Sequence, residues 1–179
     1  CAGAPGKRYA MPNAQVVMHE GSAGLGGAAA DVEIQAVNLT ATLDRIHALV
    51  RSQADRMSVE RLAKTVVLAV AIGNVDLHAK NLALLHPFDA PAALAPAYDT
   101  VPLRHQPNDG RMAFAVNGVY RHADLTIDDL ETHLGSWSPT AGGLARPTLE
   151  RIAELVESET PHPSAYAGLR REIGGFVSN

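Results

Sequence analysis

The chain has 179 residues, 46% of them hydrophobic, and a formal net charge of -4 at pH 7. This apolar content is enough for one compact core, and the acidic balance argues against an autonomous nucleic-acid binder, which needs a clustered basic surface. The single cysteine, Cys1, excludes an internal disulfide, and the most apolar run is far shorter than the roughly 20 residues that cross a bilayer. We therefore expect a single cytoplasmic domain over residues 1–179, with no direct contact to nucleic acid or membrane.

The first part of the chain, residues 1–30, is predicted to be a loop-rich arm. It contains Pro5, Pro12 and repeated glycines, a composition that favours loops over packed elements. The sequence starts at Cys1 without an initiator methionine, which we interpret as the start of a fragment. It shows no Walker-type phosphate loop and no glycine-rich nucleotide loop between strand-like runs.

Residues 31–179 are predicted to form a helical core. Apolar residues at helical intervals predict a first helix over residues 31–51. Ser58 is expected to cap a second helix that ends at Gly73. Nearly every side of this second helix is apolar, which is typical of a helix buried at the centre of a domain.

The rest of the chain is predicted to combine short strands with further helices, so the expected fold class is mainly α (α+β). The Asn117-Gly118 pair is a turn signal, and Thr126 is a candidate helix cap. We expect a loop that Trp137 pins onto the helices. The predicted strands are residues 82–85, 93–97 and 112–116, the predicted helices start at Thr126, near Pro147 and near Ser164, and the predicted loop is 135–145.

A polar segment between the buried helix and the first strand is the most informative part of the sequence. Asp76, His78, Lys80 and Asn81 lie within six residues, flanked by apolar segments on both sides. Burying an unpartnered neutral polar group costs on the order of 1 to 3 kcal/mol, and a charge costs more. A specific role for these side chains would explain why they are retained here.

A phosphoryl-transfer site would account for this combination of residue types. An aspartate accepts the proton of the attacking hydroxyl, and an asparagine about five residues later supplies an oxygen to Mg²⁺. Mg²⁺ prefers oxygen ligands and usually binds one or two carboxylates together with phosphates and waters. Asp99, which follows a predicted strand, is the expected second ligand, so Asp76, Asn81 and Asp99 form the candidate site.

The motif Gly73-Asn74-x-Asp76-x-His78-x-Lys80-Asn81, followed by Leu94-x-Pro96-x-Tyr98-Asp99, resembles the core signature of HipA-like serine/threonine-protein kinases. The resemblance extends to Gly6-Lys7-Arg8-Tyr9 and to residues 112–118. It implies the C-terminal lobe of a protein-kinase-like fold, with a catalytic loop at residues 73–82. It also implies that Asp76 is the catalytic base and that Asn81 and Asp99 bind Mg²⁺ and ATP.

Two further residues of the loop are assigned to the catalytic site. Lys80 either neutralises charge on the transferred phosphoryl group, which would make it both catalytic and ATP-binding, or pairs with Asp76; we favour the first role. His78 is expected to brace the loop by hydrogen bonding rather than to transfer protons, because this reaction needs little additional acid-base chemistry.

The resemblance also implies partners. Members of this family are toxins of toxin–antitoxin modules that phosphorylate protein hydroxyls, such as those of aminoacyl-tRNA synthetases, and bind a DNA-binding antitoxin. Their nucleotide-covering loop and ATP-anchoring lysine belong to an N-terminal lobe that this sequence lacks. We therefore expect the fragment alone to be inactive.

Two alternative functions remain open. A small-molecule phosphotransferase of the aminoglycoside-kinase type also has a loop with aspartate, histidine two residues later and asparagine five later. Against it, Gly73-Asn74-Val75 stands where that type has His-Gly, and Ala97-Tyr98-Asp99 departs from its Ile-Asp-aromatic pattern. The second alternative is a non-catalytic kinase lobe that serves as an interaction module.

Overall fold

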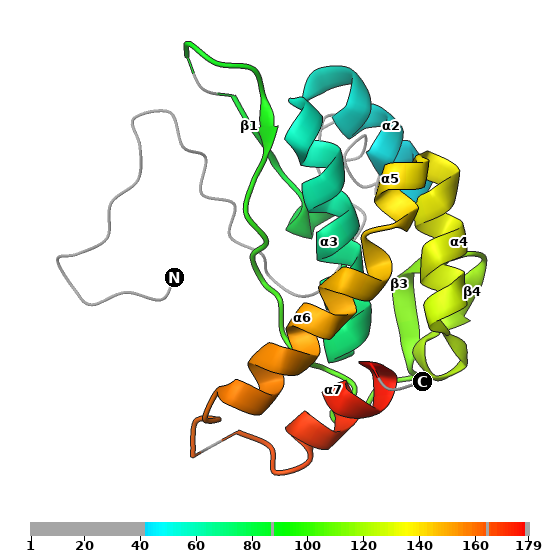
Figure 1. The fold of residues 1–179 in the computed structure, drawn as a ribbon, viewed down its shortest axis with the longest axis vertical. Helices are drawn as coiled ribbons and strands as arrows, with labels where there is room; N and C mark the ends of the chain where they lie inside the picture. The colour runs from blue at the N-terminus through cyan, green and yellow to red at the C-terminus, as the bar shows by residue number, and fades with distance from the viewer. Residues whose placement is uncertain (1–41, 87, 164, 178–179) are drawn as a thin grey trace, which may run out of the picture. The chain divides into compact units, whose positions relative to one another are not determined.

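The computed structural model describes residues 42–86, 88–163 and 165–177. The chain divides into two units, Cys1–Ile34 and Gln35–Asn179, and every described residue belongs to the second. The predicted arm at residues 1–30 lies outside the described residues. The described part consists of helices and two small antiparallel sheets, which confirms the predicted α+β class (Figure 1).

The first described helix, α2 (Leu43–Gln53), starts later than predicted. Thr42 has an extended backbone, and its hydroxyl accepts a hydrogen bond from the Arg45 N–H at 3.3 Å. An extended residue with a capping side chain ends helical geometry at that point. The prediction of one continuous helix over residues 31–51 is therefore wrong, and its first part lies outside the described residues.

The second helix, α3 (Arg56–Ile72), is the buried centre of the described part, as predicted. It lies between α2 and α6 (Ala145–Ser158) in Figure 1 and packs against both. Four of its leucine and valine side chains are at most 1% exposed: Leu62, Val66, Val67 and Val70. An α-helix that is apolar on nearly every side is stable only when other elements cover it, so α3 organises the packing of its neighbours.

The start of α3 differs from the prediction that Ser58 caps it. The cap is Asp55, whose carboxylate accepts hydrogen bonds from the Ser58 N–H at 2.9 Å and from the Ser58 hydroxyl at 2.6 Å. Ser58 lies within the first turn and is fully buried. Its hydroxyl oxygen accepts the Leu94 N–H at 2.8 Å, so it links the helix to a distant strand.

The end of α3 is a glycine turn, as predicted. Gly73 has φ = 68°, a left-handed conformation that lacks a steric penalty only in glycine. Its carbonyl accepts hydrogen bonds from the N–H groups of Leu103 and Arg104, both at 3.1 Å. The turn is thus held by a segment about 30 residues further along the chain.

A short hairpin follows the polar segment. Strands β1 (Leu84–Leu85) and β2 (Ala93–Leu94) pair antiparallel. Both are shorter than the strands predicted at residues 82–85 and 93–97. The hairpin is joined to α3 through Ser58 and through the Arg61 side chain, which donates to the Leu94 carbonyl. Because the strands run antiparallel, the chain after β2 returns alongside the polar segment.

A second hairpin is bonded to the polar segment, because the Ala113 N–H donates to the Val75 carbonyl. Strands β3 (Arg111–Val116) and β4 (Val119–Arg121) pair antiparallel around the predicted Asn117-Gly118 turn. Both turn residues have positive φ, 50° and 78°, which asparagine and glycine tolerate best. Alternate residues of β3 are buried, so one face of the hairpin joins the core.

The C-terminal part contains α4 (Ile127–Trp137), α5 (Pro139–Gly142), α6 and α7 (Leu169–Val177). The prediction of a loop at residues 135–145 is wrong. The Ser138 hydroxyl caps α5, so residues 139–142 are helical. Trp137 belongs to α4 and is 7% exposed; its indole N–H donates to the Asp44 carboxylate at 2.9 Å. The final helix starts at Leu169 rather than near Ser164.

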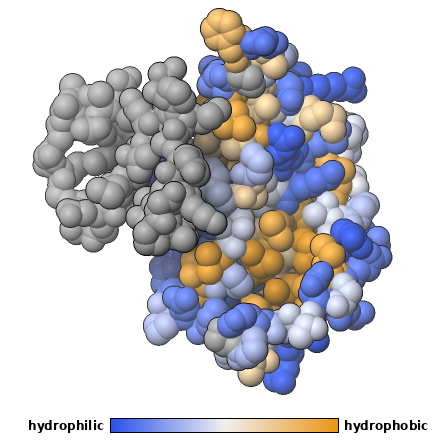
Figure 2. All heavy atoms as spheres, turned by 90° about the vertical axis from the view of Figure 1, so that its left-hand side faces the viewer, coloured by the Kyte–Doolittle hydropathy of each residue, from blue (hydrophilic) through white to orange (hydrophobic). Residues whose placement is uncertain are grey.

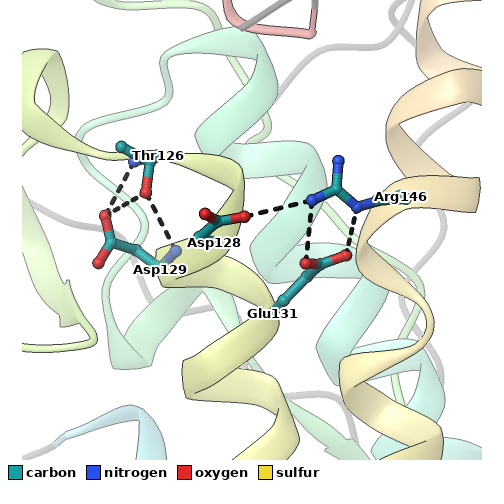
Figure 3. Close-up of polar contacts among 5 residues, drawn as sticks. All are labelled: Thr126, Asp128, Asp129, Glu131 and Arg146. Atoms are coloured by element: carbon teal, nitrogen blue, oxygen red, sulfur yellow. Dashed lines mark hydrogen bonds and ion pairs between the residues drawn. The ribbon is translucent and has the colours of Figure 1, made fainter.

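The predicted cap at Thr126 is confirmed, and α4 is also joined to α6 by an ion-pair group (Figure 3). Thr126 and Asp129 form a capping box in which each side chain accepts a hydrogen bond from the other residue's N–H. From the start of α6, Arg146 contacts Asp128 at 3.2 Å and Glu131 at 2.7 Å. The neighbouring carboxylates raise the Arg146 pKa, but these charges are exposed and contribute little to stability.

The surface of the described part is mixed in polarity. Figure 2 shows the face that lies on the left in Figure 1, where apolar side chains gather in the lower half among hydrophilic ones. Over the whole described surface, the exposed large apolar residues include Leu85, Phe88, Tyr98 and Val101. Within the described ranges, none of the helices has the length and apolar character that spanning a bilayer requires.

Three of the histidines in the described ranges are buried at contacts between elements. His47 stacks on Trp137 with ring centroids 4.8 Å apart, and His133 meets the edge of the same indole at 5.4 Å. His122 places Nε2 2.7 Å from the Val70 carbonyl oxygen. Burial is the main cause that lowers the pKa of each of the three imidazoles below its ordinary value.

This burial predicts that acid destabilises the fold near neutral pH. A histidine whose pKa is lowered on folding binds fewer protons in the folded than in the unfolded state, so its stabilisation is complete above pH 6.5, the ordinary value, and is lost below it. We expect the midpoint of thermal unfolding to fall as the pH is lowered from neutral. His133→Gln should reduce this dependence, whereas exposed His86→Gln should not. Equal pH dependence in all three proteins would contradict the prediction.

Ser58 is predicted to stabilise the junction between α3 and the first hairpin. Ser58→Ala leaves the buried Leu94 N–H without its acceptor, which should cost about 1–3 kcal/mol in the free energy of unfolding measured with urea. Ser52→Ala is the matched control, because that serine is exposed and bonds only within its own helix. The control should change stability by less than about 0.5 kcal/mol. Equal effects of the two substitutions would show that the Ser58–Leu94 link is unimportant.

Gly73→Ala tests the turn that ends α3. A left-handed alanine costs roughly 1–2 kcal/mol, and its Cβ would also lie 2.9 Å from the Arg104 Cβ. Gly118→Ala has the same backbone cost, but no atom lies within 4 Å of its Cβ. Chemical denaturation should therefore show a larger loss of stability for Gly73→Ala. If Gly118→Ala lowers the free energy of unfolding by as much as Gly73→Ala or more, then close packing against Arg104 is not the reason for glycine at position 73.

Candidate functional site

The polar segment predicted to be a catalytic loop runs from the Gly73 turn to a short 3-10 helix, η1 (Ala79–Asn81). Val75 and Leu77 are buried, whereas Asp76 between them is exposed. The Val75 carbonyl accepts the Ala113 N–H of β3 at 2.9 Å. Two buried neighbours and a link to a strand therefore hold Asp76 at the surface.

The structure brings together Asn81 and Asp99, two of the predicted site residues. The Asn81 Nδ2 donates a hydrogen bond to Asp99 Oδ2 at 2.9 Å. On its other side, Asn81 Oδ1 accepts the His78 N–H at 3.0 Å. A carboxylate needs a donor and an N–H needs an acceptor, so the two partners together determine the orientation of the amide. Asn81 is 5% exposed, which makes this orientation rigid.

Asp99 has an unusual backbone conformation. Its φ is 55°, in the left-handed region that costs a non-glycine residue of order 1–3 kcal/mol, although aspartate is among the residues that adopt it most readily. The side chain of Asn74 supports this conformation by donating to the Asp99 carbonyl at 3.4 Å. The strained backbone directs the Asp99 carboxylate to Asn81.

Asn74 is a site residue that sequence reasoning missed. It is 1% exposed, and besides its contact with Asp99 its Oδ1 accepts the Asp76 N–H at 3.2 Å. One buried carboxamide therefore links the main chain at Asp76 to the main chain at Asp99. The sequence did contain a signal for this role, because Asn74 directly follows the glycine that ends a buried helix. A polar side chain in such a place is buried only when it has hydrogen-bond partners.

Tyr98 makes a second link that sequence reasoning missed. Its hydroxyl donates to the Lys80 carbonyl at 2.7 Å, although the residue is 41% exposed. Partial burial, together with the nearby Asp99 carboxylate, raises the Tyr98 pKa, so the phenol stays protonated and remains a donor. The segment after β2 is thus joined to the loop at three points, through Asn74, Asn81 and Tyr98.

The remaining predicted site residues lie on the same loop. Asp76 is exposed, and no hydrogen bond or ion pair joins its carboxylate to another described residue. Lys80 is exposed, and His78 is partly buried and contacts Asn81 through its main-chain N–H. That contact braces the loop but does not require an imidazole.

The chemistry of this set suits a magnesium ion held partly by a substrate. Asp99 offers a carboxylate and Asn81 a carboxamide oxygen, both of which are hard ligands. No group of three or more His, Cys, Asp or Glu residues that could hold a metal occurs among the described residues. Two protein oxygens are nevertheless enough for Mg²⁺ when phosphates and waters complete its octahedral shell.

Short segments of the chain are similar to Clp protease subunits. It is 62% identical over 40 residues to the ATP-dependent Clp protease proteolytic subunit 1 of Streptomyces avermitilis, covering 22% of this chain and 18% of that protein. It is 43% identical over 63 residues to subunit 1 of Streptomyces coelicolor, covering 35% of this chain and 28% of that protein. The chain thus spans less than a third of the length of these curated relatives.

A family match covers most of the chain. Residues 13–162 match the HipA-like C-terminal domain. The matched range includes the loop at residues 73–81, Asp99 and both hairpins. It starts after Gly6-Lys7-Arg8-Tyr9, which was expected to share the resemblance and lies outside the described residues. The chain therefore belongs to the family of HipA-like C-terminal domains.

Proposed function

We propose that this chain is the catalytic-loop half of an ATP- and Mg²⁺-dependent serine/threonine-protein kinase with a two-lobed, kinase-like fold. The observation that carries the proposal is the hydrogen bond between Asn81 and Asp99 at 2.9 Å. It joins the two side chains that a phosphoryl-transfer site needs as metal ligands. Asn81 precedes the first hairpin in the chain and Asp99 follows it. Membership of the HipA-like family supports the same conclusion.

Asp76 is proposed as the catalytic base. Its carboxylate is exposed and has no partner among the described residues, so it is available to accept the proton of a substrate hydroxyl. Its N–H is held by Asn74, which also holds Asp99. This shared support keeps the base and the proposed metal ligand in a constant relative position, which phosphoryl transfer requires because positioning supplies most of its catalysis.

Asn81 and Asp99 are proposed to hold Mg²⁺, which when bound neutralises charge on the phosphates of ATP. The Asn81 oxygen already accepts the His78 N–H, but a carboxamide oxygen has two lone pairs, so one remains for the metal. Lys80 is proposed to contact the phosphates with its ammonium group, while its carbonyl is held by Tyr98. His78 contributes through the main chain of the loop.

The proposed setting follows from the family. We propose a cytoplasmic toxin of a toxin–antitoxin module, with a protein hydroxyl as substrate, for example on an aminoacyl-tRNA synthetase, and a DNA-binding antitoxin as partner. The ATP-anchoring lysine and nucleotide-covering loop are proposed to come from a separate lobe. Activity is therefore expected only when that lobe is present.

Phosphate transfer by the complete protein tests the proposal. With radiolabelled ATP and Mg²⁺, Asp76→Asn should lower the transfer rate about 10²–10⁴-fold, the usual contribution of a positioned acid or base. Asp99→Asn should lower the rate and also raise the Mg²⁺ concentration required for half-maximal activity. Incorporation of label into protein rather than into small alcohols separates a protein kinase from a small-molecule phosphotransferase.

Asp89→Asn is the matched control, because Asp89 is exposed in the turn between β1 and β2 and its side chain makes no hydrogen bond or ion pair within the described residues. It should retain wild-type transfer. A wild-type rate in Asp76→Asn would remove that residue from the mechanism. An unchanged biological effect of the full protein carrying Asp76→Asn would support the non-catalytic interaction module instead.

A further inference from the structure

A cavity behind the catalytic loop is not used by the proposed reaction. It has a volume of about 350 Å³ and lies where α7 and a short 3-10 helix, η2 (His122–Asp124), meet the end of α3. In Figure 1, α7 lies beside the lower end of α3. Ligand pockets commonly measure ~300–1,000 Å³, so the cavity has room for a small metabolite.

Two arginines give the cavity its positive charge. Arg104 comes from the segment after Asp99, and Arg171 comes from α7. No side-chain hydrogen bond or ion pair joins either guanidinium to another described residue. Arginine binds phosphate and carboxylate groups with paired N–H donors. Two such donors that face one cavity favour an anionic ligand.

Two residues that carry acceptor atoms line the same cavity. His122 is 3% exposed, and its Nε2 lies 2.7 Å from the Val70 carbonyl oxygen, which only accepts hydrogen bonds. Nε2 therefore carries the hydrogen, and in the neutral ring Nδ1 is an acceptor; it has no partner within the described ranges. Glu172 adds a carboxylate. A complementary ligand needs hydroxyl or amino donors as well as an anionic group.

The walls of the cavity are bonded to the turn that starts the catalytic loop. The Arg104 N–H donates to the Gly73 carbonyl at 3.1 Å, and His122 holds the Val70 carbonyl in the last turn of α3. A ligand that fixes Arg104 and His122 would therefore restrict motion of the Gly73 turn. Through Asn74, the next residue, this restriction reaches Asp76 and Asp99.

We propose that this cavity is a binding site for a small organic phosphate with hydroxyl or amino groups, and that occupation orders the catalytic loop. The phosphate contacts Arg104 and Arg171, and the donors contact Glu172 and His122. Binding and loop ordering do not depend on kinase activity. Only an effect on phosphoryl transfer would depend on the function proposed above.

Isothermal titration calorimetry of the complete protein with ribose 5-phosphate, compared with inorganic phosphate, tests the binding. Ribose 5-phosphate should bind more tightly than inorganic phosphate, because only it carries sugar hydroxyls. Arg171→Gln should weaken its binding about tenfold or more, as expected for the loss of a charged hydrogen bond. Arg170→Gln, the neighbouring arginine that does not line the cavity, should leave the affinity unchanged.

The site proposal is overturned if ribose 5-phosphate does not bind at millimolar concentrations, or if Arg170→Gln and Arg171→Gln weaken binding equally. Equal affinity for the two phosphates would overturn the role of the donor groups. Asp99→Asn should retain binding, whereas loss of binding in that variant would place the ligand at the kinase site. These outcomes are independent of whether the protein transfers phosphate.

Hydrogen–deuterium exchange tests the connection to the loop. Ribose 5-phosphate should slow amide exchange across residues 74–81 in the wild type and in Arg170→Gln, but not in Arg171→Gln. Binding without any change in exchange across the loop would overturn the ordering, whatever the kinase activity. Phosphoryl transfer measured with and without ribose 5-phosphate then shows whether the ordering affects catalysis.

Discussion

The burial of α3 is the constraint on which the rest of the structure depends. Because nearly all of its sides are apolar, neighbouring helices and the first hairpin must pack around it. This packing determines where the helix ends, and Gly73 then turns the chain towards the surface. The loop that follows is anchored at its start by the main chain of Leu103 and Arg104 and near its middle by β3. The packed end of α3 therefore supports the loop that carries the exposed Asp76.

Hydrogen bonds made by side chains assemble the candidate site. Asn74, Asn81 and Tyr98 join two segments that no regular sheet connects. The contacts of Asn74 and Asn81 satisfy buried carboxamides that would be costly to leave unpaired, and Asn74 also supports the strained backbone of Asp99. Strain of this kind persists only where surrounding contacts oppose it, which is the usual situation at a site that must hold charged groups in a defined geometry. The rigid arrangement suits phosphoryl transfer, in which positioning and electrostatics dominate.

The end of α3 also connects the loop with the C-terminal helix. His122 bonds to the last turn of α3 and its ring packs against Phe176 of α7 at 5.7 Å. Arg104 contacts Gly73 on the same side. His122 therefore contacts both α7 and the last turn of α3, from which the loop starts.

Periodicity and local chemistry were enough to predict α3, the Gly73 turn, the Thr126 cap and the polar loop, because each depends on neighbouring residues. The sequence also predicted that Asn81 and Asp99 meet, from the oxygen ligands that Mg²⁺ needs and from the family resemblance. Only the tertiary structure decided that Asp55 caps α3 while Ser58 binds a strand, that Ser138 keeps residues 139–142 helical, and that Asn74 and Tyr98 hold the site. Those outcomes depend on partners far along the chain, and local patterns carry no information about which distant groups satisfy a buried polar atom.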